Sequence, residues 1–346
     1  MLPHAPRPRT AAEAGPVMER RRIGPFSASA LTLGCMNLSH AYGTPPDRGT
    51  AEALLRRALD SGVDFFDTAA LYGFGSNETL VGEVLRPHRK RITLASKCGM
   101  TGVDGKKVID GRPETILRTC DDSLKRLGTE VIDLYYLHRR DRQVPIEESV
   151  GALARLVEQG KIRAVGLSEV SAETIRRAHA EHPITAVQSE YSLWTRNPEI
   201  AVLETCRELG AAFVAFSPLA RSFLTGKLTD PSTQLEDKDI RRQMPRFEAE
   251  AYAGNLKLLD GHKAMAAETG CTPAQLALAW VLARGDNVFA LFGTKSIAHL
   301  DENLGADGLK LPPETISRLD QLINQNTVVG ARYSAAIQTE IDTEEF

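Results

Sequence analysis

Eight short apolar runs, each followed by a segment with helical periodicity, constrain the fold of this chain more than any other feature of its sequence. The runs are mostly apolar, as expected for strands that helices cover, and apolar residues recur at helical spacing in the segments that follow them. Eight strand–helix units in series predict a closed (β/α)8 TIM barrel of the α/β class. The expected strands cover residues 31–36, 63–67, 92–97, 131–138, 162–168, 184–190, 212–218 and 288–293. The first expected helix begins at Asp47. The others cover residues 77–85, 113–127, 146–159, 172–180, 198–209 and 298–304, and a helical region of unstated bounds follows the seventh strand.

An open, doubly wound parallel sheet is the alternative that the same alternation allows. Its dinucleotide-binding form requires a GxGxxG turn after the first strand, and none follows residues 31–36. In the barrel reading, residues 20–325 form one domain, with a disordered extension at 1–19 and a tail at 326–346. We also expect a hairpin of strands 20–26 and 29–33, a long insertion at 225–246 and a further helix at 313–324.

The charge balance and the cysteines bear on several classes of function. Lysine plus arginine number 42 and aspartate plus glutamate 45, so the net charge of −3 gives no reason to expect nucleic acid or a membrane as a partner. The five cysteines are scattered without a CxxC pair, which argues against a disulfide framework or a zinc site and for a reducing compartment. No stretch has the apolar length of a signal peptide or a membrane span. We therefore expect a cytoplasmic protein, and no metal is implied.

Four ionisable side chains follow three consecutive strands. Asp67 ends the second expected strand, and Tyr72 lies in the loop behind it. Lys97 ends the third strand and His138 the fourth. In a barrel the carboxyl ends of the strands surround one mouth, where the chemistry takes place. A phenol titrates near ~10 and is a poor acid at neutral pH unless a cation such as Lys97 favours the phenolate.

Each of these side chains also has an ordinary structural explanation. Asp67 can cap a turn and Tyr72 can pack its ring against a neighbour. Lys97 could be a surface lysine with a buried stem, and His138 a hydrogen-bonded core histidine. Their joint placement on successive strands favours a site in which Asp67 keeps Lys97 charged and His138 orients a carbonyl.

The segment after the eighth strand is a candidate phosphate site. Residues 293–296 open a helix there, and His299, Glu302 and Asn303 follow within its first turns. Loops after the seventh and eighth strands of barrels often bind phosphate, because free N–H groups and the helix dipole favour an anion. An ordinary capped helix is the competing explanation.

Three segments of this chain resemble motifs of a known family. The segment DTAALYG at residues 67–73 is similar to the DTAxxYG motif of the aldo-keto reductases. The pair Ser96-Lys97 and the pair Leu137-His138 resemble that family's second and third motifs, in the same order. The resemblance runs from Arg20 to Leu322.

The resemblance implies a reaction and a role for each residue. Tyr72 would be the general acid that protonates the carbonyl oxygen as hydride arrives. Lys97 and Asp67 would tune the pKa of that phenol, and His138 would position the substrate. The implied protein is an NADP-dependent oxidoreductase that reduces an aldehyde or ketone to the alcohol, in class EC 1.1.1.-.

The resemblance also implies where NADP would bind. Phe216 would stack on the nicotinamide, and Lys295 would face the 2′-phosphate. Many members of the family carry Arg or Lys at the positions of Ser296 or His299, and a neutral histidine contributes little charge. The full implied set is Gly34, Met36 and Asp67 near the ring, Ser168 and Gln188 for the carboxamide, Phe216, then Ser217, Leu219, Gly226 and Lys227 on the pyrophosphate side, and Gly293, Lys295, His299, Glu302 and Asn303 at the adenosine end.

The expected substrate is a small-molecule carbonyl compound, moderately large and partly apolar. No arginine cluster in the sequence dictates an acidic substrate, and the oligomeric state stays open. The residues nominated for the pocket, each of which could equally be a packing residue, are His40, Tyr42, Arg139, Asp141, Trp194, Phe223 and Tyr333.

Two other functions remain open from the sequence. The first is an aldolase that uses Lys97 as a Schiff-base nucleophile on the same fold. The second is a non-catalytic subunit that binds NADPH and docks a partner such as a membrane channel. The complete set of four ionisable groups weighs against a pure binding protein.

Overall fold

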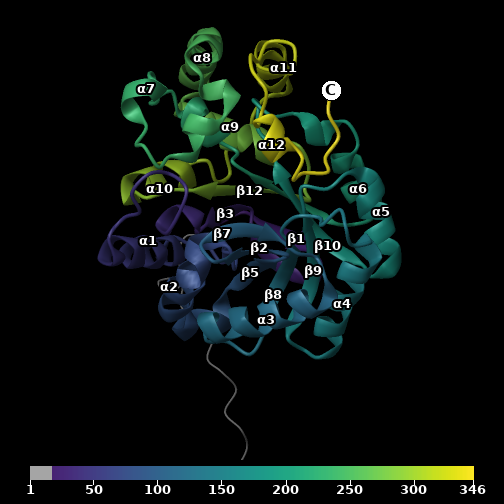
Figure 1. Cartoon of the computed structure of the whole chain (residues 1–346). Helices are drawn as coiled ribbons and strands as arrows, with labels where there is room; N and C mark the ends of the chain where they lie inside the picture. Colours follow the sequence, from purple (N-terminus) through teal and green to yellow (C-terminus); the bar gives the residue numbers. More distant parts are fainter. Residues whose placement is uncertain (1–17) are drawn as a thin grey trace, which may run out of the picture.

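A computed structural model describes residues 18–346 and contains a closed barrel of parallel strands (Figure 1). The strand order is β3-β4-β5-β8-β9-β10-β11-β12, and β12 pairs with β3 to close the ring. This confirms the predicted (β/α)8 TIM barrel over an open sheet. The strands are β3 (Leu31–Gly34), β4 (Phe65–Asp67), β5 (Thr93–Cys98), β8 (Ile132–Leu137), β9 (Ile162–Ser168), β10 (Ile184–Glu190), β11 (Ala212–Phe216) and β12 (Val288–Gly293).

Capping residues mark the ends of several helices around the barrel. Asp47 accepts a hydrogen bond from the backbone N–H of Thr50 at the start of α1. Gly128 ends α3 with φ +62°, in the left-handed region that favours glycine. The helices are α1 (Arg48–Asp60), α2 (Ser76–Leu85), α3 (Pro113–Leu127), α4 (Ile146–Glu158), α5 (Ala172–Glu181), α6 (Val202–Glu208), α9 (Pro273–Leu282) and α10 (Ile297–Leu304).

The sixth helix differs from the prediction of a helix over 198–209. Residues Asn197–Glu199 form a separate 3-10 turn, and α6 begins only at Val202. Ala201 interrupts the two, because its φ of −154° is not helical.

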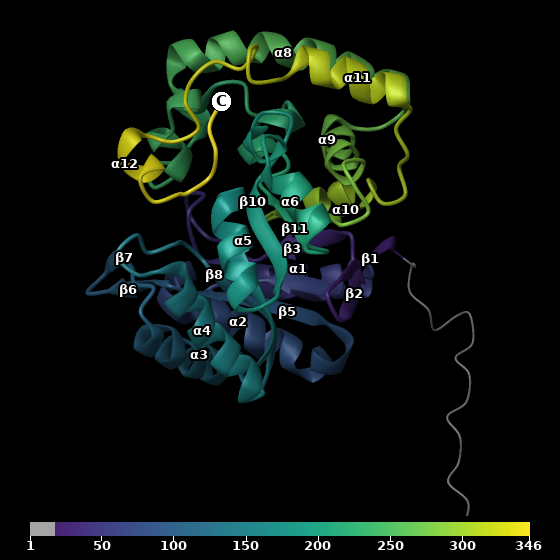
Figure 2. The same cartoon turned by 90° about the vertical axis from the view of Figure 1, so that its right-hand side faces the viewer.

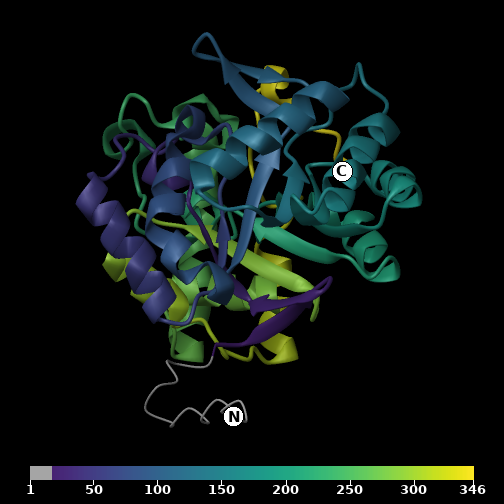
Figure 3. The same cartoon turned by 90° about the horizontal axis from the view of Figure 1, so that it is seen from below.

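A hairpin closes the amino end of the barrel and can be followed in purple in Figure 3. It consists of β1 (Arg20–Ile23) and β2 (Phe26–Ser29). Its apolar side chains Ile23 and Ala28 pack on the layer of side chains inside the barrel, beside Phe65 and Phe289. The hairpin was predicted, but its second strand was wrongly placed at 29–33, because residues from Leu31 onward pair with β12 and β4 in the barrel. With one end plugged, only the carboxyl ends of the strands are left to form a mouth.

The insertions in the loops at that mouth were predicted in part, as an irregular segment at 225–246 and a helical region after the seventh strand, but the hairpin after β5 was not. A hairpin of β6 (Met100–Val103) and β7 (Lys106–Ile109) follows β5. The loop after β11 contains short turns, α7 (Pro231–Gln234) and then α8 (Ala249–Thr269), a helix of 21 residues. The predicted helix at 313–324 is α11 (Pro313–Leu322), which packs beside α8 (Figure 2).

The carboxyl-terminal residues are packed against the barrel. After α12 (Ala335–Gln338), Asp342 forms a parallel bridge with Val170 and an ion pair with Arg140 at 3.0 Å. The segment 331–342 therefore runs along the carboxyl ends of the strands. The expected extension at 1–19 lies outside the described residues up to position 17, while Met18 is buried and Glu19 pairs with Arg21.

Candidate active site

A cavity of about 410 Å³ opens at the carboxyl ends of the strands. Its lining is mostly apolar and includes a few polar groups, among them Asp67, Tyr72 and His138, as is usual for small-molecule sites. Eleven residues that the sequence analysis nominated for catalysis or cofactor binding line it: Gly34, Met36, Asp67, Tyr72, His138, Ser168, Gln188, Phe216, Ser217, Leu219 and Gly293.

Strand register explains why the acidic and basic groups meet. Asp67 is paired with Ala95 on β5, so Lys97, two residues further, lies on the same side of the sheet. Lys97 is paired in turn with Tyr136 on β8, and two residues further lies His138. A parallel sheet with these registers therefore delivers the three side chains to one place.

The ammonium group of Lys97 is at the centre of the site and is completely buried. It forms an ion pair with Asp67, donates to the backbone oxygen of Thr68 at 2.9 Å and lies 3.2 Å from the hydroxyl of Tyr72. These three partners account for its three protons. Lys97 is thus a fixed positive charge next to the phenol.

The protonation states follow from burial and from these neighbours. Burial alone would lower the pKa of Lys97, but the charge of Asp67 and the contact with Tyr72 outweigh it, so the pKa is raised. Burial raises the pKa of Tyr72 above 10.0, and the Lys97 charge offsets this only in part. Tyr72 is therefore a protonated phenol beside a protonated amine at neutral pH.

His138 faces Tyr72 and is neutral. The two rings meet edge to face, with centroids 5.7 Å apart and an interplanar angle of 84°. Burial lowers the pKa of His138 well below 6.5, and the charges of Arg139, Lys97 and Lys107 lower it further. Its Nδ1 is buried without a hydrogen-bond partner among residues 18–346. A neutral imidazole can donate a hydrogen bond to a carbonyl oxygen without adding charge.

Side chains suited to a nicotinamide line the same cavity as Tyr72. The amide nitrogen of Gln188 donates to Asp67 at 2.9 Å, which leaves its amide oxygen as an acceptor. The hydroxyl of Ser168 accepts from Arg139 at 3.3 Å and keeps its own proton to donate. One acceptor and one donor are what a primary carboxamide needs, and the ring of Phe216 lines the same cavity.

The cations expected at the phosphate groups lie on the rim and not in the cavity lining. Lys227 forms an ion pair with Glu302 at 2.6 Å. Lys295 donates to the backbone oxygens of Tyr42 and Thr44 at 2.8 and 3.0 Å. The side chains of Lys295 and Lys227 are 33% and 54% exposed, so both can be reached by an anion. The remaining residues nominated for the cofactor that lie outside the lining are Gly226, His299, Glu302 and Asn303, and the catalytic candidate Lys97 is buried behind it.

The backbone from Ser217 to Ser222 has an unusual conformation next to these residues. Four non-glycine residues in this segment have positive φ, with Arg221 at +54° and Ser222 at +79°. Such strain is retained where function or surrounding contacts require it.

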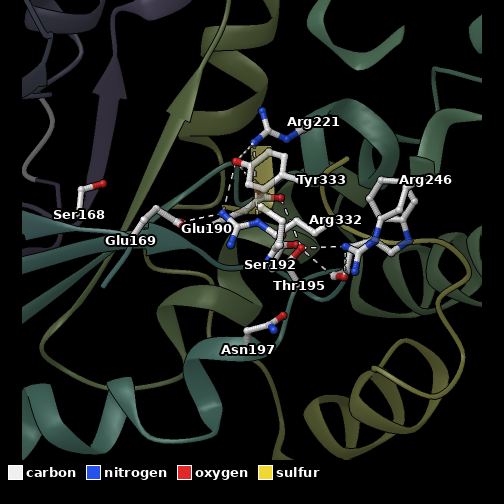
Figure 4. A network of polar contacts seen from close by, with 12 residues as sticks. Ser168, Glu169, Glu190, Ser192, Thr195, Asn197, Arg221, Arg246, Arg332 and Tyr333 are labelled. Atoms are coloured by element: carbon white, nitrogen blue, oxygen red, sulfur yellow. Dashed lines mark hydrogen bonds and ion pairs between the residues drawn. The ribbon is translucent and has the colours of Figure 1, made fainter. Parts of the chain in front are cut away.

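A buried ion cluster, shown in Figure 4, reaches the cavity through Arg221 and Tyr333. Glu190, at the end of β10, pairs with Arg221 at 2.7 Å and with Arg332 at 3.1 Å. Arg332 also pairs with Glu169 at 2.7 Å. Burial would raise the pKa of Glu190, but the two arginines lower it to about 2. The cluster holds Tyr333, whose hydroxyl accepts from Arg221 at 2.9 Å, against the cavity.

Four of the seven nominated pocket residues line the cavity: His40, Tyr42, Arg139 and Tyr333. The other three do not. Trp194 and Phe223 stack on each other with centroids 4.2 Å apart and are buried in the core. Asp141 accepts from the backbone N–H groups of Gly111 and Gln143 and so orders its own loop.

Sequence reasoning missed three charged residues of the lining: Lys107, Arg221 and Glu340. Lys107 lies on the unpredicted hairpin, and Glu340 comes from the tail. The signal for Lys107 was the run Lys106-Lys107-Val108-Ile109 after a glycine-containing turn, which has the pattern of a short strand.

Fold and site together define a (β/α)8 barrel with a buried acid–base cluster at the carboxyl ends of its strands. A model of the aldo/keto reductase family matches residues 30–324. A protein of Glycine max described as probable aldo-keto reductase 1 is 44% identical over 311 residues, covering 89% of each chain. This chain belongs to the aldo/keto reductase family and is an oxidoreductase that acts on carbonyl compounds.

Solved structures agree with this assignment. A glycerol dehydrogenase from Gluconobacter oxydans superimposes with a TM-score of 0.82 at 29% identity, covering 91% of this chain and 99% of its own. The holo form of an aldo-keto reductase from Bacillus halodurans gives a TM-score of 0.75 at 28% identity, covering 92% and 99%. No helix among residues 18–346 has the length and apolar character needed to cross a membrane.

Proposed function

We propose that this protein reduces an aldehyde or ketone to the alcohol with NADPH as the hydride donor and Tyr72 as the general acid. The observation that carries the proposal is the buried contact of Lys97 with both Asp67 and Tyr72 at the cavity wall. Bound NADPH would supply the hydride. Its nicotinamide would be held by Ser168 and Gln188, with Phe216 against the ring.

The proton transfer follows from the protonation states. A carbonyl oxygen placed between Tyr72 and His138 accepts a hydrogen bond from each. As negative charge develops on that oxygen, the phenol of Tyr72 gives up its proton, and the phenolate forms next to the fixed charge of Lys97. Asp67 keeps Lys97 protonated throughout. His138 stays neutral and orients the oxygen.

The contacts of Lys97 argue against a Schiff-base aldolase. A nucleophilic amine needs a free lone pair, whereas the pKa of Lys97 is raised and its three protons are engaged. No contact in the described part of the chain favours a purely regulatory role.

The test is Tyr72→Phe, which removes one hydroxyl from the site. We expect turnover of an aldehyde panel to fall at least about 100-fold, as for the loss of a general acid, while the dissociation constant for NADPH changes little. The matched control is Tyr135→Phe. That phenol is also buried but lies on β8, where it faces the helices, 3.5 Å from the hydroxyl of Ser123. Near-normal turnover in Tyr72→Phe would remove the phenol from the acid role.

A further inference from the structure

Arg139 is the one charged residue of the cavity lining, among residues 18–346, with no opposite charge beside it. Asp67 is paired with Lys97, and Arg221 with Glu190 at 2.7 Å. Arg139 has no carboxylate within ion-pair distance in the described part of the chain.

Neutral acceptors alone hold the Arg139 guanidinium in place. Its Nη1 donates to the backbone oxygen of His138 at 2.7 Å and to the hydroxyl of Ser168 at 3.3 Å. Its Nε is buried and has no hydrogen-bond partner among residues 18–346. A buried N–H without an acceptor is rare in proteins, because its desolvation is not compensated. The guanidinium is therefore anchored beside the imidazole while part of its hydrogen-bonding capacity is unused.

A second cation enters the same cavity from the β6–β7 hairpin. Lys107 lines the cavity, and its ammonium contacts both carboxylate oxygens of Glu340 at 2.6 and 2.5 Å. Lys107 and Arg139 line the same cavity as His138 and come from two different loops, and the charges of both lower the pKa of the imidazole. Lys107 is 41% exposed, and an exposed ion pair of this kind contributes little free energy.

We propose that Arg139 and Lys107 form an anion subsite, and that the preferred substrates are aldehydes or ketones that also carry a carboxylate. This inference rests on the proposed function and names its substrate class. The fork of Arg139 suits a carboxylate, which can accept two parallel N–H bonds. The carboxylate of Glu340 forms an ion pair with Lys107 when no substrate is bound, and a substrate carboxylate takes its place in that pair. The sequence alone did not indicate this, because Lys107 lies on a hairpin that was not predicted.

The experiment compares two aldehydes of similar shape, 4-carboxybenzaldehyde and 4-nitrobenzaldehyde. In Arg139→Met we expect kcat/KM for the carboxylated aldehyde to fall about 10- to 100-fold, which is the range of a charge-assisted hydrogen bond. The value for the nitro compound should change by less than about 3-fold. Lys107→Met should act in the same direction with a smaller effect. Arg139→Lys should restore part of the loss, because it keeps the charge without the fork.

The control for loss of a positive charge is Arg177→Gln, because Arg177 pairs with Glu147 on the outer helices at 2.8 Å. Glu340→Gln should raise kcat/KM for 4-carboxybenzaldehyde, since Lys107 then has no resident counter-ion. An equal loss on both aldehydes in Arg139→Met, with weaker NADPH binding, would assign Arg139 to the cofactor through Ser168 and overturn the subsite.

A binding measurement separates this inference from the proposed function. Benzoate is titrated calorimetrically into the full chain saturated with NADP⁺, which requires no turnover. If the protein reduces no aldehyde but Arg139→Met abolishes benzoate binding, the proposed function fails and the anion subsite stands. If benzoate binds equally to both proteins, or to neither, the subsite is wrong whatever the activity.

Discussion

Tyr72 and His138 have opposite shifts of pKa with the same main cause. Burial disfavours the charged form of each group, so the phenol stays protonated to higher pH and the imidazole stays neutral to lower pH. The charge of Lys97 reduces the first shift and adds to the second. Both groups are thus held in the forms that reduction of a carbonyl requires.

The pH dependence of the reaction follows from these directions. Reduction needs the protonated phenol, and the pKa of Tyr72 lies above 10.0, so kcat/KM for aldehyde reduction should fall only above that pH. Alcohol oxidation needs the phenolate and should become faster as the pH rises. The pKa of His138 lies well below 6.5, so neither direction should show a step there. Initial rates of aldehyde reduction and of alcohol oxidation, measured over a range of pH, test both expectations. A step in reduction near pH 6.5 would mean that His138 changes its charge in the working range.

At the residue scale, the sequence predicted side chains that end strands and missed those on insertions. Asp67, Lys97 and His138 could be predicted because strand ends converge in any barrel. Trp194 was left open between pocket and packing and turns out to be a packing residue, because an aromatic residue in a loop has the same pattern whether it lines a pocket or stacks on a buried ring such as Phe223.

At the scale of elements, a glycine allows two helices of the outer layer to approach closely. A Cβ at Gly82 of α2 would lie 2.5 Å from the backbone oxygen of Leu127, at the end of α3. Backbone cannot swing aside as a side chain can. Gly82→Ala should therefore lower the free energy of unfolding by about 1–3 kcal/mol, although alanine is the better helix former.

The matched control for that prediction lies in α4. A Cβ at Gly151 would find only a glutamate oxygen at 3.5 Å, which is ordinary contact. Gly151→Ala should raise the free energy of unfolding by up to about 1 kcal/mol. Urea denaturation of the two variants gives the comparison. A stabilised Gly82→Ala protein would show that α2 and α3 do not pack as described.

The carboxyl-terminal segment is held by the buried ion cluster. In Arg332→Met the carboxylate of Glu169 loses its ion pair, and Glu190 keeps only Arg221. We expect a loss of about 3–5 kcal/mol, as when one partner of a buried pair is removed. Proteolysis should then cut within 326–346 faster than in the parent protein. Adding Glu169→Gln should recover part of the stability, and no recovery would contradict the pairing.

At the element scale, the bounds of regular units were predictable, whereas inserted elements were predicted without bounds or not at all. The helix at 113–127 was predicted with both bounds, because a proline begins it and Gly128 ends it. The long helix α8 was expected only as a helical region of unstated bounds after the seventh strand, because polar and apolar residues are spread around it without a clear apolar face.

At the scale of the whole molecule, loops from three parts of the barrel meet over the site. Tyr42, in the loop after β3, forms a bridge with Asp239 of the insertion after β11. Thr44 donates to Glu236 of the same insertion at 2.8 Å. Lys295, after β12, joins this group by binding the backbone oxygens of Tyr42 and Thr44. The barrel was predictable from a local alternation, but these contacts join residues about 200–250 positions apart, and no local pattern indicates them.

The position of Lys295 at that junction leads to a test of cofactor choice. If its ammonium turns to the 2′-phosphate of NADPH, then Lys295→Ala should weaken NADPH binding about 10- to 100-fold and leave NADH nearly unchanged, because NADH has no such phosphate. Lys227→Ala is the matched comparison, since Lys227 is also a rim cation, paired with Glu302. It was assigned to the pyrophosphate, which both cofactors share, so its loss should weaken both equally. Fluorescence titration of each of the two variants with NADPH and with NADH measures the four dissociation constants. Equal losses for NADPH and NADH in Lys295→Ala would instead mean that Lys295 serves only to hold Tyr42 and Thr44 in place.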